Sequence, residues 1–414
     1  MRAGVTLLAA VALLAGGPAA SSTAATTGSK PSISARSAVL VDARDGHVLY
    51  AHRSRSRRPI ASTTKLMTAL ITLQQFPRLG HRLVAAPYKA GPAESRINLR
   101  PGERLAVRDL LLALLLESAN DAAETLARGS TGSVRSFVAR MNERAQRLGL
   151  RDTHYANPVG IDDPANYSSA MDLSLLARTL LQNETFATIV DLPSARLRTG
   201  ARPRIVSNRN RLVATVPWVD GVKTGHTQQA GYVLVGSGTR KGVHLVSVVM
   251  GAPSESQRDA DTLALLRYGF SRYHVARPVK AGVPLTRAKV EYFGDRKVPL
   301  VARQGVKVPL RRGQRARTVV DAPEELKGPI PAGTRVGSVS VFKEGQRVRV
   351  LPLETGEAVP EAGFLRRLVH SPVFWFFLLG SVALLALAAR RRAARRRRRR
   401  EARKSGNRER RVVT

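Results

Sequence analysis

Residues 61–67 read Ala-Ser-Thr-Thr-Lys-Leu-Met and form the stretch around which the rest of the fold can be predicted. Ser62 and Lys65 are three residues apart, so on a helix they lie one turn from each other on the same face. The apolar residues from Leu66 to Leu73 predict a helix buried on most sides, at the centre of a domain. An amine beside a hydroxyl can activate a serine nucleophile when no histidine serves as the base. Because Ser-x-x-Lys also occurs by chance on protein surfaces, its meaning depends on the rest of the chain.

The N-terminus has the order of features found in a secretory signal peptide. Met1-Arg2 is followed by an apolar run over residues 5–14 and then by small residues up to Ala25. The alternative, a buried N-terminal helix, fits these flanks less well. We expect residues 1–25 to be a signal peptide cleaved between Ala20 and Ala25, and the Ser/Thr-rich residues 26–34 to be a flexible spacer.

The C-terminus predicts a membrane anchor. Residues 372–389 are apolar and carry no charge, and the length of this segment is at the short end of what crosses a bilayer. Arginines follow at once, and a core helix would not end in such a block of charge. By the positive-inside tendency, residues 390–414 are a basic cytoplasmic tail and everything before the span lies outside, with 361–371 as a juxtamembrane linker.

The formal net charge of +38 among 414 residues does not by itself indicate nucleic-acid binding. The tail from Arg390 onward contributes +12, which topology and anionic inner-leaflet lipid explain. The remaining +26 is spread over the exported part and suggests an anionic surrounding such as wall polymer or lipid. Nucleic acid is not an expected partner outside the cell. The absence of cysteine excludes disulfides, cysteine-zinc sites and thiol chemistry.

The exported part divides into two predicted domains. Residues 35–275 begin with a hairpin around Asp45-Gly46 and end with two strands and a helix. Helices are predicted between them, so this domain is α+β, an antiparallel sheet covered by helices. The predicted helices are residues 107–116, 134–148, 170–182 and 258–270. The predicted strands are residues 231–237 and 243–250. Residues 276–360 alternate β-branched and charged residues between turns, which predicts a small all-β domain in a spacer or docking role.

Three short motifs follow one another along the first domain: Ser62-Thr63-Thr64-Lys65, Ser118-Ala119-Asn120 and Lys223-Thr224-Gly225. Such a set, with Ser-Asp-Asn as the middle motif, is typical of penicillin-binding proteins and class A β-lactamases. With the residues around these motifs, the chain resembles the serine-type D-alanyl-D-alanine carboxypeptidases, the low-molecular-mass penicillin-binding proteins, over most of residues 35–360. The resemblance implies a β-lactamase/transpeptidase-like domain, then a small β domain ahead of a membrane anchor.

Chemistry suggests a role for most of the motif residues. Ser62 would attack the carbonyl between two D-alanines and form an acyl-enzyme. Lys65 can be the base only when neutral, and Lys223 beside it in a partly desolvated cleft would lower its pKa. Ser118 could relay a proton to the departing amine, and Asn120 could hold the peptide part of the substrate. No metal or other cofactor is expected, because His226 alone offers no metal-ligand spacing.

The resemblance implies further binding residues. The backbone N–H groups of Ser62 and His226 would form the oxyanion hole. Thr224 and Arg209, beside Lys223 and Gly225, would hold the terminal carboxylate. Arg209 could equally be one of many surface arginines, and the imidazole of His226 could only shape the site. The implied partners are a peptidoglycan stem peptide ending in D-Ala-D-Ala and β-lactams as covalent inhibitors, in cell-wall biogenesis, while the oligomeric state is left open.

Three other functions compete with carboxypeptidase activity. A class A β-lactamase uses a glutamate on an intermediate loop, and residues 151–172 contain none. A D,D-transpeptidase would pass the acyl group to an amine, and the motifs do not exclude it. A catalytically inactive wall-binding scaffold would have no need of three intact motifs. We therefore expect hydrolysis of the terminal D-alanine from stem peptides.

Overall fold

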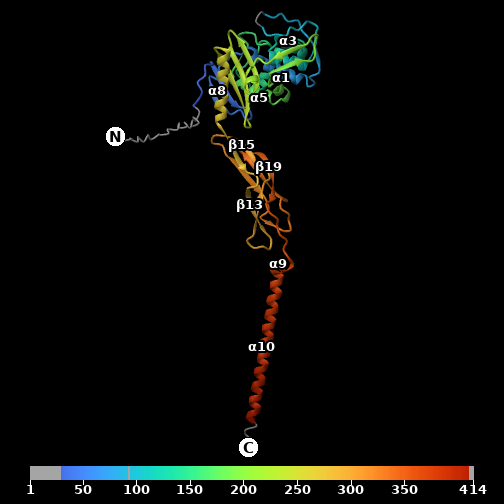
Figure 1. Cartoon of the computed structure of the whole chain (residues 1–414), viewed down its shortest axis with the longest axis vertical. Helices are drawn as coiled ribbons and strands as arrows, with labels where there is room; N and C mark the ends of the chain where they lie inside the picture. Colours follow the sequence, from blue (N-terminus) through green and yellow to red (C-terminus); the bar gives the residue numbers. More distant parts are fainter. Residues whose placement is uncertain (1–28, 92–93, 410–414) are drawn as a thin grey trace, which may run out of the picture. The chain divides into compact units, whose positions relative to one another are not determined.

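The computed structural model describes residues 29–91 and 94–409. The predicted signal peptide at residues 1–25 lies outside the described residues. Contacts divide the chain into two compact units, one up to Tyr273 and one from His274 (Figure 1).

The first unit is built on a five-stranded antiparallel sheet with strand order β2-β1-β11-β10-β9. The turn at Asp45-Gly46 joins the first two strands, as the sequence predicts. β9 is the outermost strand, so one of its edges is free of strand pairing within this sheet. The strands are β1 (Ser37–Asp42), β2 (Val48–His52), β9 (Val219–Thr227), β10 (Gly231–Arg240) and β11 (Val243–Ala252).

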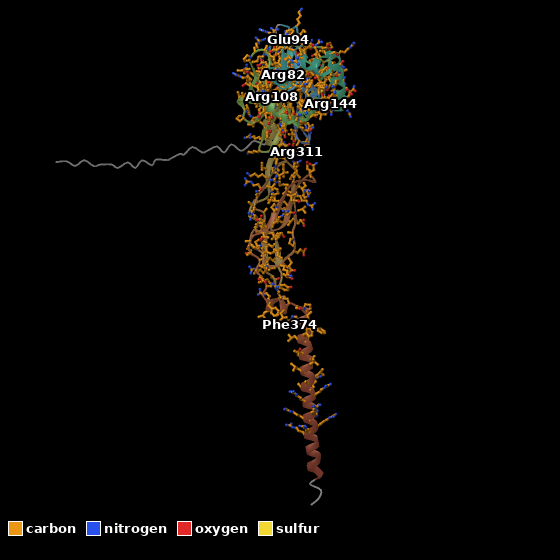
Figure 2. All side chains as sticks on the ribbon, turned by 90° about the vertical axis from the view of Figure 1, so that its right-hand side faces the viewer. Arg82, Glu94, Arg108, Arg144, Arg311 and Phe374 are labelled. Carbon is orange, nitrogen blue, oxygen red and sulfur yellow. The ribbon has the colours of Figure 1, made fainter. Side chains whose placement is uncertain are left out.

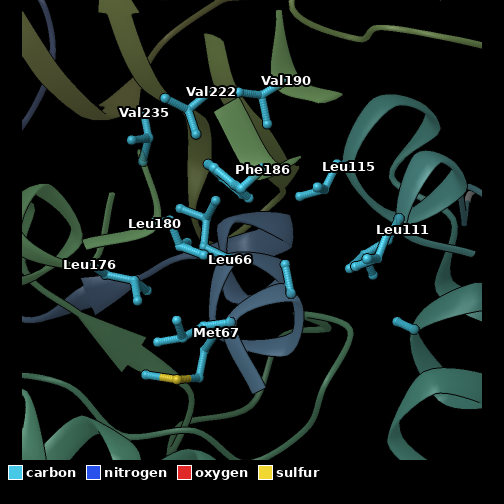
Figure 3. Packing of buried hydrophobic residues seen from close by; sticks show 14 of the residues in the cluster. Leu66, Met67, Leu111, Leu115, Leu176, Leu180, Phe186, Val190, Val222 and Val235 are labelled. Carbon is cyan, nitrogen blue, oxygen red and sulfur yellow. The ribbon is translucent and has the colours of Figure 1, made fainter. Parts of the chain in front are cut away.

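Both faces of this sheet are covered by helices. Side chains alternate along a strand, so Val39 and Val41 of β1 enter the larger core while Leu40 points to the other face. The smaller core lies under α8 (Glu255–Ser271). On the larger side, α1 (Lys65–Gln75) is surrounded by side chains from several elements (Figure 3). The other helices are α2 (Val107–Leu112), α3 (Asn120–Thr131), α4 (Val134–Arg147), α5 (Ala170–Leu181), α6 (Glu184–Val190) and α7 (Leu212–Thr215).

Figure 3 shows why α1 is the centre of the domain. Leu66 and Met67 of α1 are labelled there, and both side chains are fully buried. Leu180 and Phe186 approach from α5 and α6, and Leu111 approaches from α2. An apolar helix that is buried on nearly all sides holds its N-terminal end in a fixed place. That end carries Lys65 and directly follows the turn that carries Ser62.

Three short strand pairs complete the first unit. They are β3 (Arg58–Pro59) with β6 (Tyr167–Ser168), β4 (Arg82–Val84) with β5 (Arg104–Ala106), and β7 (Ser194–Leu197) with β8 (Arg204–Ser207). A buried ion pair links β8 to the residue directly before β5. Arg204 donates hydrogen bonds to both carboxylate oxygens of Glu103, at 2.7 and 2.9 Å. Burial raises the pKa of Glu103, but the hydrogen bonds from Arg204 and from the backbone of Arg100 and Ala201, with the charge of Arg204, together outweigh burial and hold the pKa at about 2.

The structure differs from the sequence-based expectation at two places near the motifs. The predicted helix 107–116 is broken, because α2 ends at Leu112 and a π-helical turn, η2 (Ala113–Glu117), follows. Residues 219–227, for which no separate strand was predicted, form the nine-residue strand β9. The glycines of β9 make this segment look less like a strand in the sequence. Glycine is needed there because β9 packs closely on neighbouring segments.

The second unit contains an all-β part and the C-terminal helices. Residues 276–360 hold strands and no helix, as predicted. Its six-stranded sheet has the order β16-β18-β19-β14-β13-β17, and β12 pairs with β15 separately. The strands are β12 (Tyr273–Val279), β13 (Pro284–Val290), β14 (Lys297–Val301), β15 (Val306–Arg311), β16 (Ala316–Asp321), β17 (Glu325–Leu326), β18 (Arg335–Lys343) and β19 (Gln346–Thr355).

The chain then forms α9 (Phe364–Val369) and the long α10 (Pro372–Glu409). Within the described residues, α10 is the one helix that is long and apolar enough to cross a membrane, with a mean hydropathy of 2.2 in its apolar part. None of that part is buried against protein, and Figure 2 draws its side chains from Phe374 onward projecting freely from the helix. This is consistent with a membrane anchor.

Candidate active site

Ser62 and Lys65 meet at the start of α1. Ser62 lies on a short 3-10 turn, η1 (Ala61–Thr64), and Lys65 is the first residue of the α-helix. The amine of Lys65 is 3.0 Å from the hydroxyl oxygen of Ser62 and also donates to the carbonyl oxygen of Val159. Lys65 is fully buried, whereas Ser62 is half-buried and lines a cavity.

The electrostatic surroundings of Lys65 favour its neutral form. Burial lowers the pKa of Lys65 well below 10.5, and the charge of Lys223 lowers it further. The negative charges of Glu94 and Asp121 act in the opposite direction but are weaker. A neutral amine in contact with a hydroxyl can accept its proton, as a general base must.

Two glycines allow other segments to approach η1 closely. Gly160 has φ +88°, and a Cβ there would lie 2.0 Å from the carbonyl oxygen of Ala61. A Cβ on Gly225 of β9 would lie 3.1 Å from the backbone nitrogen of Ser62. The loop before β6 and the strand β9 therefore press against the turn that carries the serine. Any larger side chain at Gly160 would displace this turn.

The second motif lies where η2 meets α3. Ser118 has φ 62°, in the left-handed region, and this reversal ends the π-helical turn. Its hydroxyl is buried, lines the same cavity as Ser62 and has no hydrogen-bond partner within the described residues. Asn120 begins α3 and is buried, and its side-chain amide donates to a carboxylate oxygen of Glu94 at 2.7 Å.

Sequence reasoning did not identify Glu94. Its carboxylate accepts hydrogen bonds from Asn120, from the hydroxyl of Tyr88 and from the backbone nitrogen of Gly91. Burial raises the pKa of Glu94, but the hydrogen bonds from Tyr88, Asn120 and Gly91 and the charge of Lys65 together outweigh burial, so the net shift is downward. Glu94 lies in a loop without regular structure, and no local pattern indicates that this loop reaches Asn120.

The third motif lies on β9, next to η1. Lys223 is fully buried, and its amine donates to the carbonyl oxygen of Thr224 at 3.0 Å. Burial is the main cause that lowers the pKa of Lys223 to about 7, and the positive charges of Arg209 and Arg258 add to it. The exposed imidazole of His226 stacks on Tyr232 of the neighbouring strand, with ring centres 4.1 Å apart.

A cavity of about 580 Å³ brings the three motifs together. The predicted site residues that line it are Ser62, Ser118, Arg209, Thr224, Gly225 and His226. Lys65, Asn120 and Lys223 are buried and are not among the lining residues. The structure thus gathers all nine predicted residues, six on the surface of the cavity and three within its walls.

Three arginines line one part of this cavity: Arg209, Arg211 and Arg258. Arg209 forms an ion pair with Glu117 at 2.5 Å, and 55% of its side chain is exposed. Arg258 is only 3% exposed and forms ion pairs with Asp259 at 2.8 Å and with a glutamate one helical turn earlier at 3.1 Å. Sequence reasoning missed Arg258, because nothing in the predicted helix 258–270 shows which of its side chains reaches the site.

The described residues 29–91 and 94–409 contain no group of three or more His, Asp or Glu side chains that could hold a metal ion.

The family model for D-alanyl-D-alanine carboxypeptidases matches residues 24–254, and that for the C-terminal domain of penicillin-binding protein 5 matches residues 273–361. The chain belongs to the D-alanyl-D-alanine carboxypeptidase family. This carboxypeptidase is a serine-type hydrolase, as the three motifs predicted.

Similar proteins support this assignment over most of the chain. The D-alanyl-D-alanine carboxypeptidase DacF of Bacillus subtilis is 30% identical over 349 residues, covering 82% of this chain and 90% of that protein. Penicillin-binding protein 5 of Haemophilus influenzae is 29% identical, with a TM-score of 0.57, over 80% of this chain and 99% of the solved chain. A DD-transpeptidase from a Streptomyces strain is 33% identical, with a TM-score of 0.56, over 59% of this chain and 99% of the solved chain.

Proposed function

We propose that this carboxypeptidase removes the terminal D-alanine from peptidoglycan stem peptides through an ester on Ser62. The observation that carries the proposal is the contact between Ser62 and the buried, readily deprotonated Lys65 at the wall of the cavity. The hydroxyl oxygen of Ser62 attacks the carbonyl of the penultimate D-alanine while Lys65 takes its proton. The amide C–N bond then breaks, the departing amine receives a proton, and water hydrolyses the ester to free the enzyme.

The neighbouring residues support this sequence of steps. The hydroxyl of Ser118, which has no hydrogen-bond partner among the residues that the structure describes, is available to pass the proton from Lys65 to the departing amine. The backbone N–H groups of Ser62 and His226 would bind the oxyanion, and the close approach of Gly225 to Ser62 supports their pairing. Asn120 would hold the acyl part of the substrate, with its amide oriented by Glu94.

The free edge of β9 supports an extended substrate. β9 is the outer strand of the sheet, so a peptide can bind along its free edge as an added strand, with Ser62 of the neighbouring η1 beside it. At one end of this path, Thr224 and the buried Arg258 would bind the terminal carboxylate. Arg209 would have a smaller part than the sequence suggested, because its side chain is 55% exposed and ion pairs at exposed sites are weak.

Replacing Arg258 by glutamine is expected to lower kcat/KM for a peptide ending in a free carboxylate by roughly 30-fold, because a buried charge-assisted pair is lost. For the same peptide with a C-terminal amide the rate should hardly change. Steady-state kinetics on both peptides, with the full chain in detergent, checks this. Arg209→Gln is the matched control and should reduce the rate only a few-fold, since ion pairs at exposed sites are weak. Equal losses on both peptides would contradict a carboxylate-binding role.

Transfer of the acyl group to an amine is the second candidate function, because a structural relative of this chain is described as a DD-transpeptidase. A β-lactamase is less well supported, since residues 151–172 contain no glutamate. Glu94 does lie near the site, but its carboxylate is engaged by Tyr88, Gly91 and Asn120. β-Lactams are instead expected to acylate Ser62 and remain bound.

Incubation of the full chain with a peptide ending in D-Ala-D-Ala, with and without an acceptor D-amino acid, tests the proposed function. We expect free D-alanine and the shortened peptide in equal amounts in both cases, as measured by chromatography and mass spectrometry. If the acceptor-linked peptide exceeds the shortened peptide, the protein is mainly a transpeptidase. If no D-alanine is released from this peptide, the proposed substrate is wrong.

We also propose the topology that the sequence suggests. Residues 1–25 would be removed after export, 26–34 would be a spacer, and the domains at 35–275 and 276–360 would lie outside the membrane. Residues 361–371 would link them to a span at 372–389, with the tail at 390–414 in the cytoplasm. The exposed apolar part of α10 supports the span, and the arginines after it support the orientation.

A further inference from the structure

A separate cavity of the first unit shares no lining residue with the active-site cavity. Its volume is about 410 Å³, within the range of roughly 300–1,000 Å³ that is usual for small-molecule sites. Its lining comes from the end of β1, the β1–β2 turn, α5, and the two chain segments that carry Arg55 and Arg151. The proposed reaction does not use this space.

Three arginines from three segments line this cavity: Arg55, Arg151 and Arg178. Arg55 and Arg151 are exposed, and Arg178 is half-buried. Within residues 29–91 and 94–409, none of the three guanidinium groups forms an ion pair, and Arg178 alone donates side-chain hydrogen bonds. A guanidinium group stays protonated at all ordinary pH values. The cavity therefore contains three permanent cations that have donors available for an anion.

The guanidinium group of Arg178 is held in place from two sides. Its Nε donates to the carbonyl oxygen of Ala43 at 3.0 Å, and one terminal nitrogen donates to the carbonyl oxygen of Arg44 at 3.3 Å. The other terminal nitrogen lies against Gly46, which has φ +76° and where a Cβ would collide with it. Glycine at this turn thus leaves room for the guanidinium group, which two backbone carbonyls and the turn keep beside the cavity.

The backbone next to the other two arginines is fixed to the start of α5. The backbone nitrogen of Met171 donates to the carbonyl oxygen of Ser54, the residue before Arg55, at 2.9 Å. The carboxylate of Asp172 accepts a hydrogen bond at 2.7 Å from the backbone nitrogen that directly follows Arg151. All three arginines are therefore presented by segments that are hydrogen-bonded to one helix or lie on it.

The charges around the cavity do not cancel. One carboxylate, that of Asp172, belongs to the lining, and counted with its full charge it leaves an excess of two positive charges there. Three further acidic residues adjoin the lining in sequence. Asp152 forms an ion pair with Arg57 at 3.3 Å, and Asp45 is balanced by the arginine that precedes it in the turn. Asp42 lies on the opposite face of β1, because side chains alternate along a strand.

We propose that this cavity binds a phosphate ester, the group that anionic wall polymers and anionic lipid headgroups share, and so attaches the first domain to its anionic surrounding. Guanidinium groups bind phosphate oxygens in pairs, and a phosphate group has enough oxygens for arginines from more than one segment. The lining also contains Val41, Met171 and Leu175, whose apolar side chains can contact the carbon part of the ester. This inference does not rest on the proposed reaction.

Isothermal titration calorimetry of the full chain in an uncharged detergent at low salt tests the site. The probe is sn-glycerol 3-phosphate, and the matched control is glycerol, which has the same carbon skeleton and no charge. We expect saturable one-to-one binding of glycerol phosphate and none of glycerol. The Kd should rise as salt is added, because two of the three arginines are exposed to screening ions.

Replacing Arg55 and Arg151 together by glutamine should raise the Kd roughly fivefold, since each exposed charge contributes modestly. Arg178→Gln should raise it roughly tenfold, because a half-buried, positioned guanidinium group makes stronger charge-assisted bonds. Arg240→Gln, at an exposed arginine on β10, is the matched control and should keep the wild-type Kd. The double variant removes no hydrogen bond between described residues, so its thermal midpoint should not change and its Kd decides the test even if Arg178→Gln unfolds. Absence of binding by the wild type, or an unchanged Kd in the double variant, overturns the site.

Two larger probes distinguish the sources of the phosphate ester. One is a trimer of glycerol phosphate linked by phosphodiesters, and the other is dihexanoyl phosphatidylglycerol. Compared per phosphate group, tighter binding of the trimer assigns the site to a wall polymer, whereas tighter binding of the lipid assigns it to a membrane headgroup. If neither probe competes with glycerol phosphate, the cavity does not attach the domain to either surrounding, and the proposal is wrong.

Discussion

A Ser62→Ala variant is expected to release D-alanine at least about 10⁴-fold more slowly than the wild type, because the nucleophile of the reaction is lost. It should also fail to become labelled by a fluorescent penicillin, since no oxygen remains to form the ester. Ser62 is half-buried at the wall of the cavity, and removing one hydroxyl there leaves the packing of the turn in place. The thermal midpoint should therefore change little.

Gel fluorescence for the label and chromatography for D-alanine measure both effects on the same preparation. Ser271→Ala, which removes an exposed hydroxyl at the end of α8, is the control and should behave as the wild type. If the Ser62→Ala protein is still labelled at the wild-type rate, another residue is the nucleophile, and the proposed mechanism is wrong.

The second large effect is expected at Lys65. Lys65→Gln should slow acylation by penicillin about 10²- to 10⁴-fold, the range that a positioned general base contributes. Lys65→Arg separates the role of a base from that of a charge, because a guanidinium stays protonated and cannot accept a proton. A base role predicts similar losses in both variants, whereas a purely electrostatic role predicts that the arginine variant retains its rate.

The pH dependence provides an independent readout of the same role. The pKa of Lys65 is lowered from 10.5 chiefly by burial, so the reactive, neutral form becomes populated well below that pH. The rate of acylation in the wild type should rise as the pH increases through this lowered pKa. Stopped-flow measurements with a chromogenic β-lactam should show this rise in the wild type and not in Lys65→Gln. A wild-type rate that falls over the same range would contradict a neutral Lys65 as the base.

The position of the nucleophile could be predicted because it depends on local spacing. Residues at i and i+3 are neighbours on both α- and 3-10 turns, so Ser62 and Lys65 meet although the serine precedes the α-helix. The conformation of Ser118 was not predictable in the same way. Its left-handed backbone arises where a π-helical turn is forced to end against α3, and the sequence there resembles an ordinary apolar helix.

The residues that sequence reasoning missed came from distant segments. Glu94 reaches Asn120 across a gap of 26 residues, and Arg258 reaches the cavity from a helix close to the end of the domain. Their places depend on how a loop folds over α3 and how α8 packs on the sheet. Arg209 was predicted as a carboxylate-binding residue from its neighbours in sequence. Its exposure and its ion pair with Glu117 are properties of the folded surface.

The sequence by itself determined the three motifs, the family, the α+β and all-β character of the two domains and the apolar C-terminal helix, because periodicity and spacing are local properties of the chain. The tertiary structure alone decided which charges share the cavity and which of them are buried. Burial and neighbouring charges set the lowered pKa values of Lys65 and Lys223, and both depend on packing between segments far apart in sequence.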